Sequence, residues 1–226
     1  MALYLGRDRM AINLNWSSNS GSNSGSSGSN ESSVGSFIDG TNTDIYSPVA
    51  TGIQSNAFYQ PPITSIDLPM ATSVGQYACY MCDNLASVNL PMVTSVGQYA
   101  FRGCESLVSI NLPSLINLNK YAFRDCTSLT SVDFSSAVII ENHAFQDCSA
   151  LTTIILRSET MCQLLATAGI SPTAISDGDG YIYVPAALLE TYKSATNWSA
   201  YAEQFRALED YTVDGTITGE LDDTKI

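Results

Sequence analysis

Six cysteines and one histidine are among the residues with which this chain could ligate a metal ion or attack a substrate. Four of the cysteines recur every 22 positions, at Cys82, Cys104, Cys126 and Cys148. Cys79 and Cys82 form a C-x-x-C pair, but a structural zinc site needs four ligands, and neither a second pair nor a nearby histidine accompanies this one. We therefore predict no metal and no cofactor, and interpret the cysteines as free thiols that act as small hydrophobic residues in a core.

The remaining polar residues predict no catalytic site. No nucleophile has a plausible base partner, and no glycine-rich phosphate loop is present. The segment Asp177-Gly178-Asp179-Gly180 resembles part of a calcium loop but lacks the other ligands, so a plain turn is the simpler interpretation. The two carboxylates of a glycosidase are recognised by their separation in space, which a sequence does not give. Polysaccharide degradation therefore remains an alternative function.

The spacing of the cysteines belongs to a longer repeat, which predicts the fold. Blocks of 22 residues begin at Ile63, Leu85, Leu107, Leu129 and Leu151. A fixed period of this length is typical of stacked coils, each of which buries its apolar edge against the next. We predict that one core ladder runs through the stack, formed by Cys82, Cys104, Cys126, Cys148, Phe101, Phe123 and Phe145.

Each block is predicted to contain two short strands. In the block that begins at Leu85, Val88 and Leu90 should point inward while Ser87 and Asn89 point outward. Pro91 ends this strand because proline has no N–H to donate to a ladder. A second strand carries inward residues such as Val96.

Two rows of outward side chains are candidates for contact with a ligand. The first sheet presents Asp67, Asn89, Asn111, Asp133 and Ile155. The second row, near the second strand, consists of Tyr77, Tyr99, Tyr121 and His143. A row of tyrosines offers rigid, amphipathic area for contact with sugar or protein. The same row could instead do no more than shield the joints between coils.

The predicted fold class is a mainly β repeat solenoid of 22-residue coils with a C-terminal α/β cap of two helices. Pro185 favours the start of one helix, and an amphipathic pattern from Trp198 to Leu208 indicates another. The domains predicted are an attachment hairpin (1–16), a Ser/Gly/Asn linker (17–36), an N-terminal cap with a degenerate coil (37–62), the solenoid (63–156), the helical cap (157–210) and an acidic tail (211–226).

The charge of the chain limits its partners. The net charge is −13, with nine basic and 22 acidic residues. The absence of a basic patch in the sequence argues against nucleic acid, and an anionic membrane would repel the chain. No apolar run is long enough for a spanning helix, so no membrane insertion is predicted. Arg7, Asp8 and Arg9 make the N-terminus a poor secretion signal, which favours release within an assembled particle.

The motifs themselves resemble those of a known family. The pattern Leu85-x-x-Val88-x-Leu90-Pro91, followed by Thr94-Ser95-Val96-Gly97-x-Tyr99-Ala100-Phe101-x-x-Cys104, resembles the BspA-like leucine-rich-repeat family across residues 46–156. The ending, Tyr181-Ile182-Tyr183-Val184-Pro185 through Asn197-Trp198, looks like the cap that follows such repeats in gut bacteria and their prophages. Residues 1–13 are similar to N-terminal segments of phage tail-associated proteins. The chain departs from ordinary leucine-rich repeats in lacking their asparagine ladder.

The resemblance implies adhesion, and it brings no catalytic residues. We predict a non-enzymatic binding module that contacts a protein or glycan on a cell surface. Residues 1–16 would attach it to other proteins of a phage tail or virion, and they could also drive assembly into a homotrimer, because an isolated hairpin is at best marginally stable. A bacterial cell-surface adhesin is the alternative.

Overall fold

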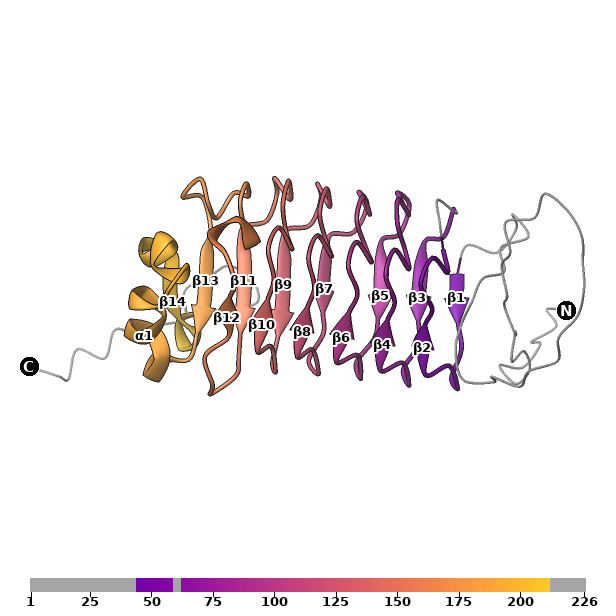
Figure 1. Cartoon of the computed structure of the whole chain (residues 1–226), viewed down its shortest axis with the longest axis horizontal. Helices are drawn as coiled ribbons and strands as arrows, with labels where there is room; N and C mark the ends of the chain where they lie inside the picture. The colour runs from indigo at the N-terminus through magenta and orange to yellow at the C-terminus, as the bar shows by residue number, and fades with distance from the viewer. Residues whose placement is uncertain (1–43, 59–61, 212–226) are drawn as a thin grey trace, which may run out of the picture.

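The computed structural model describes residues 44–58 and 62–211. The predicted attachment hairpin, the linker and nearly all of the acidic tail lie outside these residues. Within them the chain winds into a rod whose coils lie side by side, with β1 at one end and a helical cap at the other (Figure 1).

Two faces of the rod are built from short parallel strands. The first face holds two adjoining ladders, ordered β1-β3-β5 and β7-β9-β11-β13-β14, and the second holds one ladder ordered β2-β4-β6-β8-β10-β12. Strands of the first face are β1 (Asp44–Tyr46), β3 (Ser65–Asp67), β5 (Ser87–Asn89), β7 (Ser109–Asn111), β9 (Ser131–Phe134), β11 (Thr153–Leu156), β13 (Tyr181–Val184) and β14 (Phe205–Ala207). Those of the second are β2 (Gly52–Ile53), β4 (Ser73–Val74), β6 (Ser95–Val96), β8 (Asn117–Leu118), β10 (Ile139–Ile140) and β12 (Gln163–Leu164). This arrangement confirms the predicted repeat solenoid.

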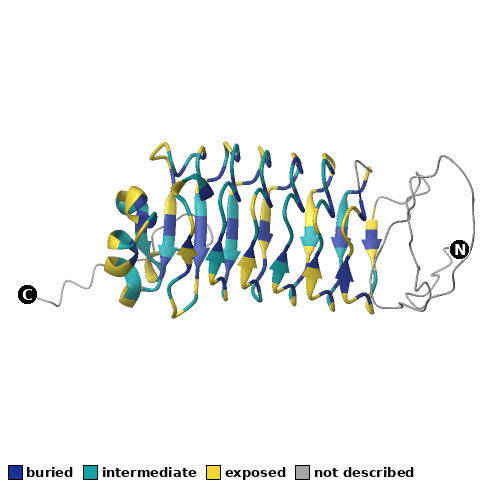
Figure 2. Cartoon of the chain, viewed as in Figure 1, coloured by how far each residue is buried: buried dark blue, intermediate teal, exposed yellow. Residues whose placement is uncertain are grey.

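The register of the strands follows the sequence period. Ile66 pairs with Val88 on the first face, and Val74 pairs with Val96 on the second, each 22 residues apart. Inward residues of the strands are largely buried and their neighbours more exposed, as Figure 2 shows along the rod. The ladders also include β1 and β2, one on each face, so one further coil precedes the block that begins at Ile63.

A corner turn closes each coil, and backbone hydrogen bonds join successive turns. Phe101 N–H donates to Ala122 O at 2.8 Å, and Phe123 N–H donates to Ala144 O at 2.8 Å. Gly97 allows the coils to approach closely here, because a Cβ at this position would lie 2.6 Å from the carbonyl carbon of Gly75. The turns are not strands, but their backbone hydrogen bonds make them a third side of the rod on which successive coils are joined.

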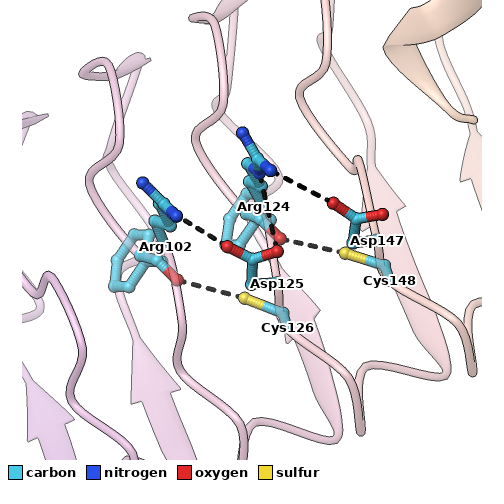
Figure 3. Close-up of polar contacts among 8 residues, drawn as sticks. Arg102, Arg124, Asp125, Cys126, Asp147 and Cys148 are labelled. Atoms are coloured by element: carbon cyan, nitrogen blue, oxygen red, sulfur yellow. Dashed lines mark hydrogen bonds and ion pairs between the residues drawn. The ribbon is translucent and has the colours of Figure 1, made fainter. Parts of the chain in front are cut away.

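Phenylalanines and cysteines fill the interior behind these turns. The side chains of Phe101, Phe123 and Phe145 are fully buried, with successive ring centroids 5.2 and 5.6 Å apart. All six cysteines are buried and free. The thiol of Cys126 donates to Phe101 O at 3.0 Å, and that of Cys148 donates to Phe123 O at 2.9 Å (Figure 3). The cysteines therefore bond neighbouring coils as well as fill space.

The strict period ends after β11. Ile139 pairs with Gln163, 24 positions on, and Ile154 pairs with Ile182, 28 positions on. The longer excursion, which is the segment between β11 and β13, contains β12 and the 3-10 turn η1 (Thr167–Gly169). Two further strands, β13 and β14, continue the first face into the cap.

The cap contains less helix than predicted. Its elements are η2 (Ala186–Leu188), α1 (Leu189–Ser194), η3 (Trp198–Gln204) and η4 (Leu208–Asp210). The second helix predicted from Trp198 to Leu208 is present but differs in type and length: it is a 3-10 helix broken at Tyr201, and after Gln204 the chain continues as strand β14.

Side chains of the cap bind the backbone of the last coil. Tyr192 Oη accepts the N–H of Cys162 at 2.7 Å, and Trp198 Nε1 donates to Cys162 O at 2.7 Å. Asn197 Nδ2 donates to Leu164 O at 2.8 Å, and Tyr201 Oη donates to Thr167 O. These bonds occupy the outer edge of β12, which would otherwise be a template for pairing with another strand.

Candidate binding surface

The corner turns carry a stack of aromatic side chains along the rod. Tyr77, Tyr99, Tyr121 and His143 occupy the same place in four successive turns. Ring centroids are 4.9, 4.8 and 5.0 Å apart in that order, and the rings are within 15° of parallel. The distance matches the spacing of hydrogen-bonded strands, because the stack follows the rise from one coil to the next.

The backbone of this row is left-handed. Its φ angles are 54° at Tyr77, 58° at Tyr99, 59° at Tyr121 and 58° at His143. A left-handed conformation costs a residue with a side chain about 1–2 kcal/mol relative to the right-handed one, and each aromatic pair returns about 0.5–1.5 kcal/mol. Stacking therefore at best offsets the backbone cost. Asparagine adopts this conformation more readily, as Asn56 does at the equivalent place with φ of 58°.

Stacking decides which part of each tyrosine is available to a ligand. The ring faces of Tyr99 and Tyr121 lie against their neighbours, so edges and phenol groups are presented outward. Within the described residues, the phenol groups of Tyr77, Tyr99 and Tyr121 have no hydrogen-bond partner, and all three side chains are partly exposed. Burial and the adjacent Tyr121 and Tyr77 raise the pKa of Tyr99. The row thus offers phenol groups at intervals of one coil.

Two arginines beside the row are held by carboxylates from the next coil, as Figure 3 shows. Arg102 Nε donates to Asp125 at 2.9 Å, and Arg124 Nη2 donates to Asp147 at 3.4 Å. The guanidinium of Arg102 lies 5.5 Å from the ring centroid of Tyr80 and 5.8 Å from that of Tyr99. Arg124 lies 5.7 Å from that of Tyr121. Lys120 lies in the same turn as Tyr121, and its carbonyl oxygen accepts the N–H of Tyr99 at 3.2 Å. We call this surface the aromatic corner: Tyr77, Tyr80, Tyr99, Arg102, Lys120, Tyr121, Arg124 and His143.

The sequence-based prediction missed these arginines, although a signal for them exists. Each arginine precedes its aspartate by 23 positions, one repeat plus one residue, in both pairs. Asp125 and Asp147 also have positive φ angles, 61° and 63°, which aspartate tolerates better than most residues. A search of the sequence for arginine and aspartate 23 positions apart would have found both ion pairs.

His143 ends the aromatic row. Its ring stacks on Tyr121, and its backbone N–H donates to Ala168 O at 3.0 Å. Its Nδ1 atom is buried and has no hydrogen-bond partner among the described residues. The chain turns into the longer excursion after this coil, so the row stops where the repeat does.

The predicted row on the first sheet lies on strands, separate from the turns that carry the tyrosines. Asn89 Nδ2 donates to Asp67 at 2.7 Å, and Arg157 binds Asp133 with both Nε and Nη2, at 2.9 and 2.7 Å. Asn111 is exposed on β7. Ile155 departs from the prediction of an outward contact position, because only 2% of it is exposed. Asp67 and Asn89 thus bind each other, Asp133 binds Arg157, and the row forms no shared site with the aromatic corner.

The described residues contain no group of three or more side chains suited to hold a metal ion. In the same part of the chain, no helix has the length and apolar character that crossing a bilayer requires.

The short parallel strands repeat every 22 residues, and leucine and other apolar side chains fill the interior of the stack. This architecture is that of a leucine-rich-repeat solenoid. Residues 51–163 match the BspA type leucine rich repeat region in six copies, which covers half of the sequence. The chain belongs to this family, as its motifs predicted. No curated protein matches the sequence.

Several solved structures are similar. Pneumococcal vaccine antigen PcpA aligns with a TM-score of 0.53 at 12% identity, over 74% of this chain and 43% of that one. A leucine-rich repeat protein of T. pallidum aligns with a TM-score of 0.38 at 23% identity, over 54% and 71%. One from Bacteroides ovatus aligns with a TM-score of 0.35 at 19% identity, over 60% and 43%. The chain spans less than half of the pneumococcal protein, and at this identity the likeness shows the fold alone.

Proposed function

We propose that this protein is a non-enzymatic binding module whose contact surface is the aromatic corner. One observation carries the proposal: four aromatic side chains occupy left-handed turn positions that asparagine would adopt at lower cost, and three of them present phenol groups without a partner in the described chain. Stability of the rod does not account for both features. Membership of a family associated with adhesion supports the same conclusion.

We propose further that residues 1–16 attach the rod to a phage or prophage tail. Support comes from the sequence: of the 20 residues at positions 17–36, 18 are serine, glycine or asparagine, a composition that is typical of linkers. A linker of this kind implies that the segments on both sides of it have a function. The competing function, an adhesin on the bacterial surface, is supported by the family. Imaging the protein in its native setting, on virions or on cells, separates the two.

A conservative substitution tests the binding surface. The triple variant Tyr77→Phe/Tyr99→Phe/Tyr121→Phe keeps the stack and removes the phenol groups. We expect unchanged thermal unfolding and at least about tenfold weaker binding of full-length protein to a panel of bacterial and epithelial cells, since removing buried interface contacts commonly has effects of this size.

The matched control is Asn89→Ser/Asn111→Ser on the first sheet, which should bind as the wild type does. If the phenylalanine variant binds cells normally, the tyrosines serve only to shield the joints between coils. Release of reducing sugar from a capsule by the purified protein would contradict the non-enzymatic assignment.

A further inference from the structure

Positive charge in the repeats is confined to the aromatic corner. Residues 63–150 contain three basic residues, and all three, Arg102, Lys120 and Arg124, lie in the corner turns. The same turns contribute three acids, Asp125, Glu141 and Asp147, while the other four acids of this block lie outside them. In a chain of net charge −13, the corner therefore holds all the basic side chains of the repeats, with Arg102 and Arg124 each beside an aspartate.

The two guanidinium groups are fixed in position before any ligand arrives. Asp125 binds Arg102 at Nε, 2.9 Å away, and also lies 3.5 Å from Nε of Arg124. Burial opposes the charge of Arg102, but its hydrogen bond to Asp125 and the nearby Tyr80 outweigh burial and raise its pKa. The Nη atoms of Arg102 have no partner among the described residues. A planar, oriented guanidinium loses little side-chain freedom when it binds a carboxylate through those atoms.

The neutral groups around the arginines match a sugar better than a peptide. Tyrosine rings repeat once per coil, with centroids 4.8–4.9 Å apart, which is comparable to the length of one sugar ring in a linear chain. An extended peptide would gain affinity by pairing its backbone with a free strand edge. At this corner the backbone is already occupied, since Phe101 N–H and Gly103 N–H donate to the next coil.

We propose that the aromatic corner binds a linear glycan that carries carboxylate groups and lies along the rod axis. Its carboxylates would contact Arg102, Arg124 and Lys120, and its hydroxyl groups would contact the phenols. The proposal rests on the proposed function, in which this corner is the contact surface, and adds the chemical class of the ligand.

The test measures binding of the full-length protein to uronate oligosaccharides: oligogalacturonate, alginate and hyaluronate oligomers, each beside its carboxyl-reduced form. We expect at least one acidic oligomer to bind, its reduced form to bind about fivefold or more weakly, and high salt to weaken binding, as for exposed ion pairs. Lys120→Gln should weaken binding of the acidic oligomer by about fivefold. Lys193→Gln, which removes the same charge from the cap, should leave it unchanged.

The outcomes separate this inference from the proposed function. Equal binding of acidic and reduced oligomers overturns the role of the carboxylate. Equal binding of a poly-glutamate peptide of similar length overturns the assignment to a glycan. If no acidic oligomer binds while cell binding still depends on the three phenol groups, the ligand class is wrong and the binding surface stands. If the triple phenylalanine variant binds cells as strongly as the wild type, the proposed function itself is wrong.

Discussion

The stack of coils and the cap that closes it are stabilised in different ways. In the stack each contact is repeated: a phenylalanine lies over a phenylalanine, and a thiol donates to a carbonyl group of the preceding coil. In the cap each contact occurs once, as when Tyr192, Trp198 and Asn197 bind separate backbone groups of the last coil. The first region depends on burial that recurs, whereas the second depends on individual polar bonds at an edge.

This difference predicts where each region fails. A repeat contacts mainly its neighbours, so a defect in one coil weakens the whole array through its two interfaces. A defect in the cap instead exposes one edge and opens the rod from that end. Both regions are needed because a repeat array without a capped end leaves strand edges exposed.

Alkaline pH should have the largest effect, and it should act mainly on the stack. Burial raises the pKa of Cys79, Cys104 and Cys148 above the ordinary value of 9.0, and raises that of Cys162, beside the cap, to about 12. In this range the folded state holds the protons that the unfolded state releases, so stability falls as pH rises above 9. Between pH 8 and 10 each such thiol costs about 1.4 kcal/mol.

Urea unfolding at the two pH values, under reducing conditions, measures this loss. Cys104→Ala should show a smaller loss than the wild type, because one titrating thiol has been removed. An unfolding free energy that stays constant from pH 8 to 10 would contradict burial of the thiols.

The substitution Phe123→Ala should come next. Phe123 is fully buried between two other rings, and removing such a side chain from a core costs about 3–5 kcal/mol. Urea unfolding of the variant measures the change. The control Val108→Ala removes a side chain that is 52% exposed and should change stability by less than about 0.5 kcal/mol. Equal effects of the two substitutions would mean that the ring ladder does not hold the coils together.

The substitution Tyr192→Phe should have the smallest effect of the three and should act locally. It keeps the buried ring but leaves the N–H of Cys162 without its acceptor, which costs about 1–3 kcal/mol. Hydrogen exchange should increase around β12 and α1 while the amides near Phe101 stay protected. Tyr181→Phe, at a side chain that is 43% exposed, is the control. Uniformly faster exchange along the rod would show that cap and stack are a single cooperative unit.

The stack was predictable for the same reason that it is stable. The interval between Cys82, Cys104, Cys126 and Cys148 fixed the coil length, and strand register followed from it, as the pairing of Val74 with Val96 shows. The cap was predicted less well. The apolar spacing from Trp198 to Leu208 fits a helix, but Trp198 and Tyr201 bind carbonyl groups of the last coil, and these bonds favour an irregular path. Because each of these contacts occurs only once, no repeating pattern in the sequence predicts them.

The sequence alone determined that the chain forms stacked coils, that the cysteine and phenylalanine positions coincide from coil to coil, and that tyrosines line up in a row. The repeat length can be read from the sequence. Because each repeat buries the same positions against its neighbour, the repeat length also sets how the strands of successive coils pair. Only the tertiary structure decided how that row can bind. The rings stack at the rise of the coils, so their faces are hidden and their phenol groups are presented, and the arginines are held by aspartates from the next coil. These features depend on distances between coils, which no single repeat encodes.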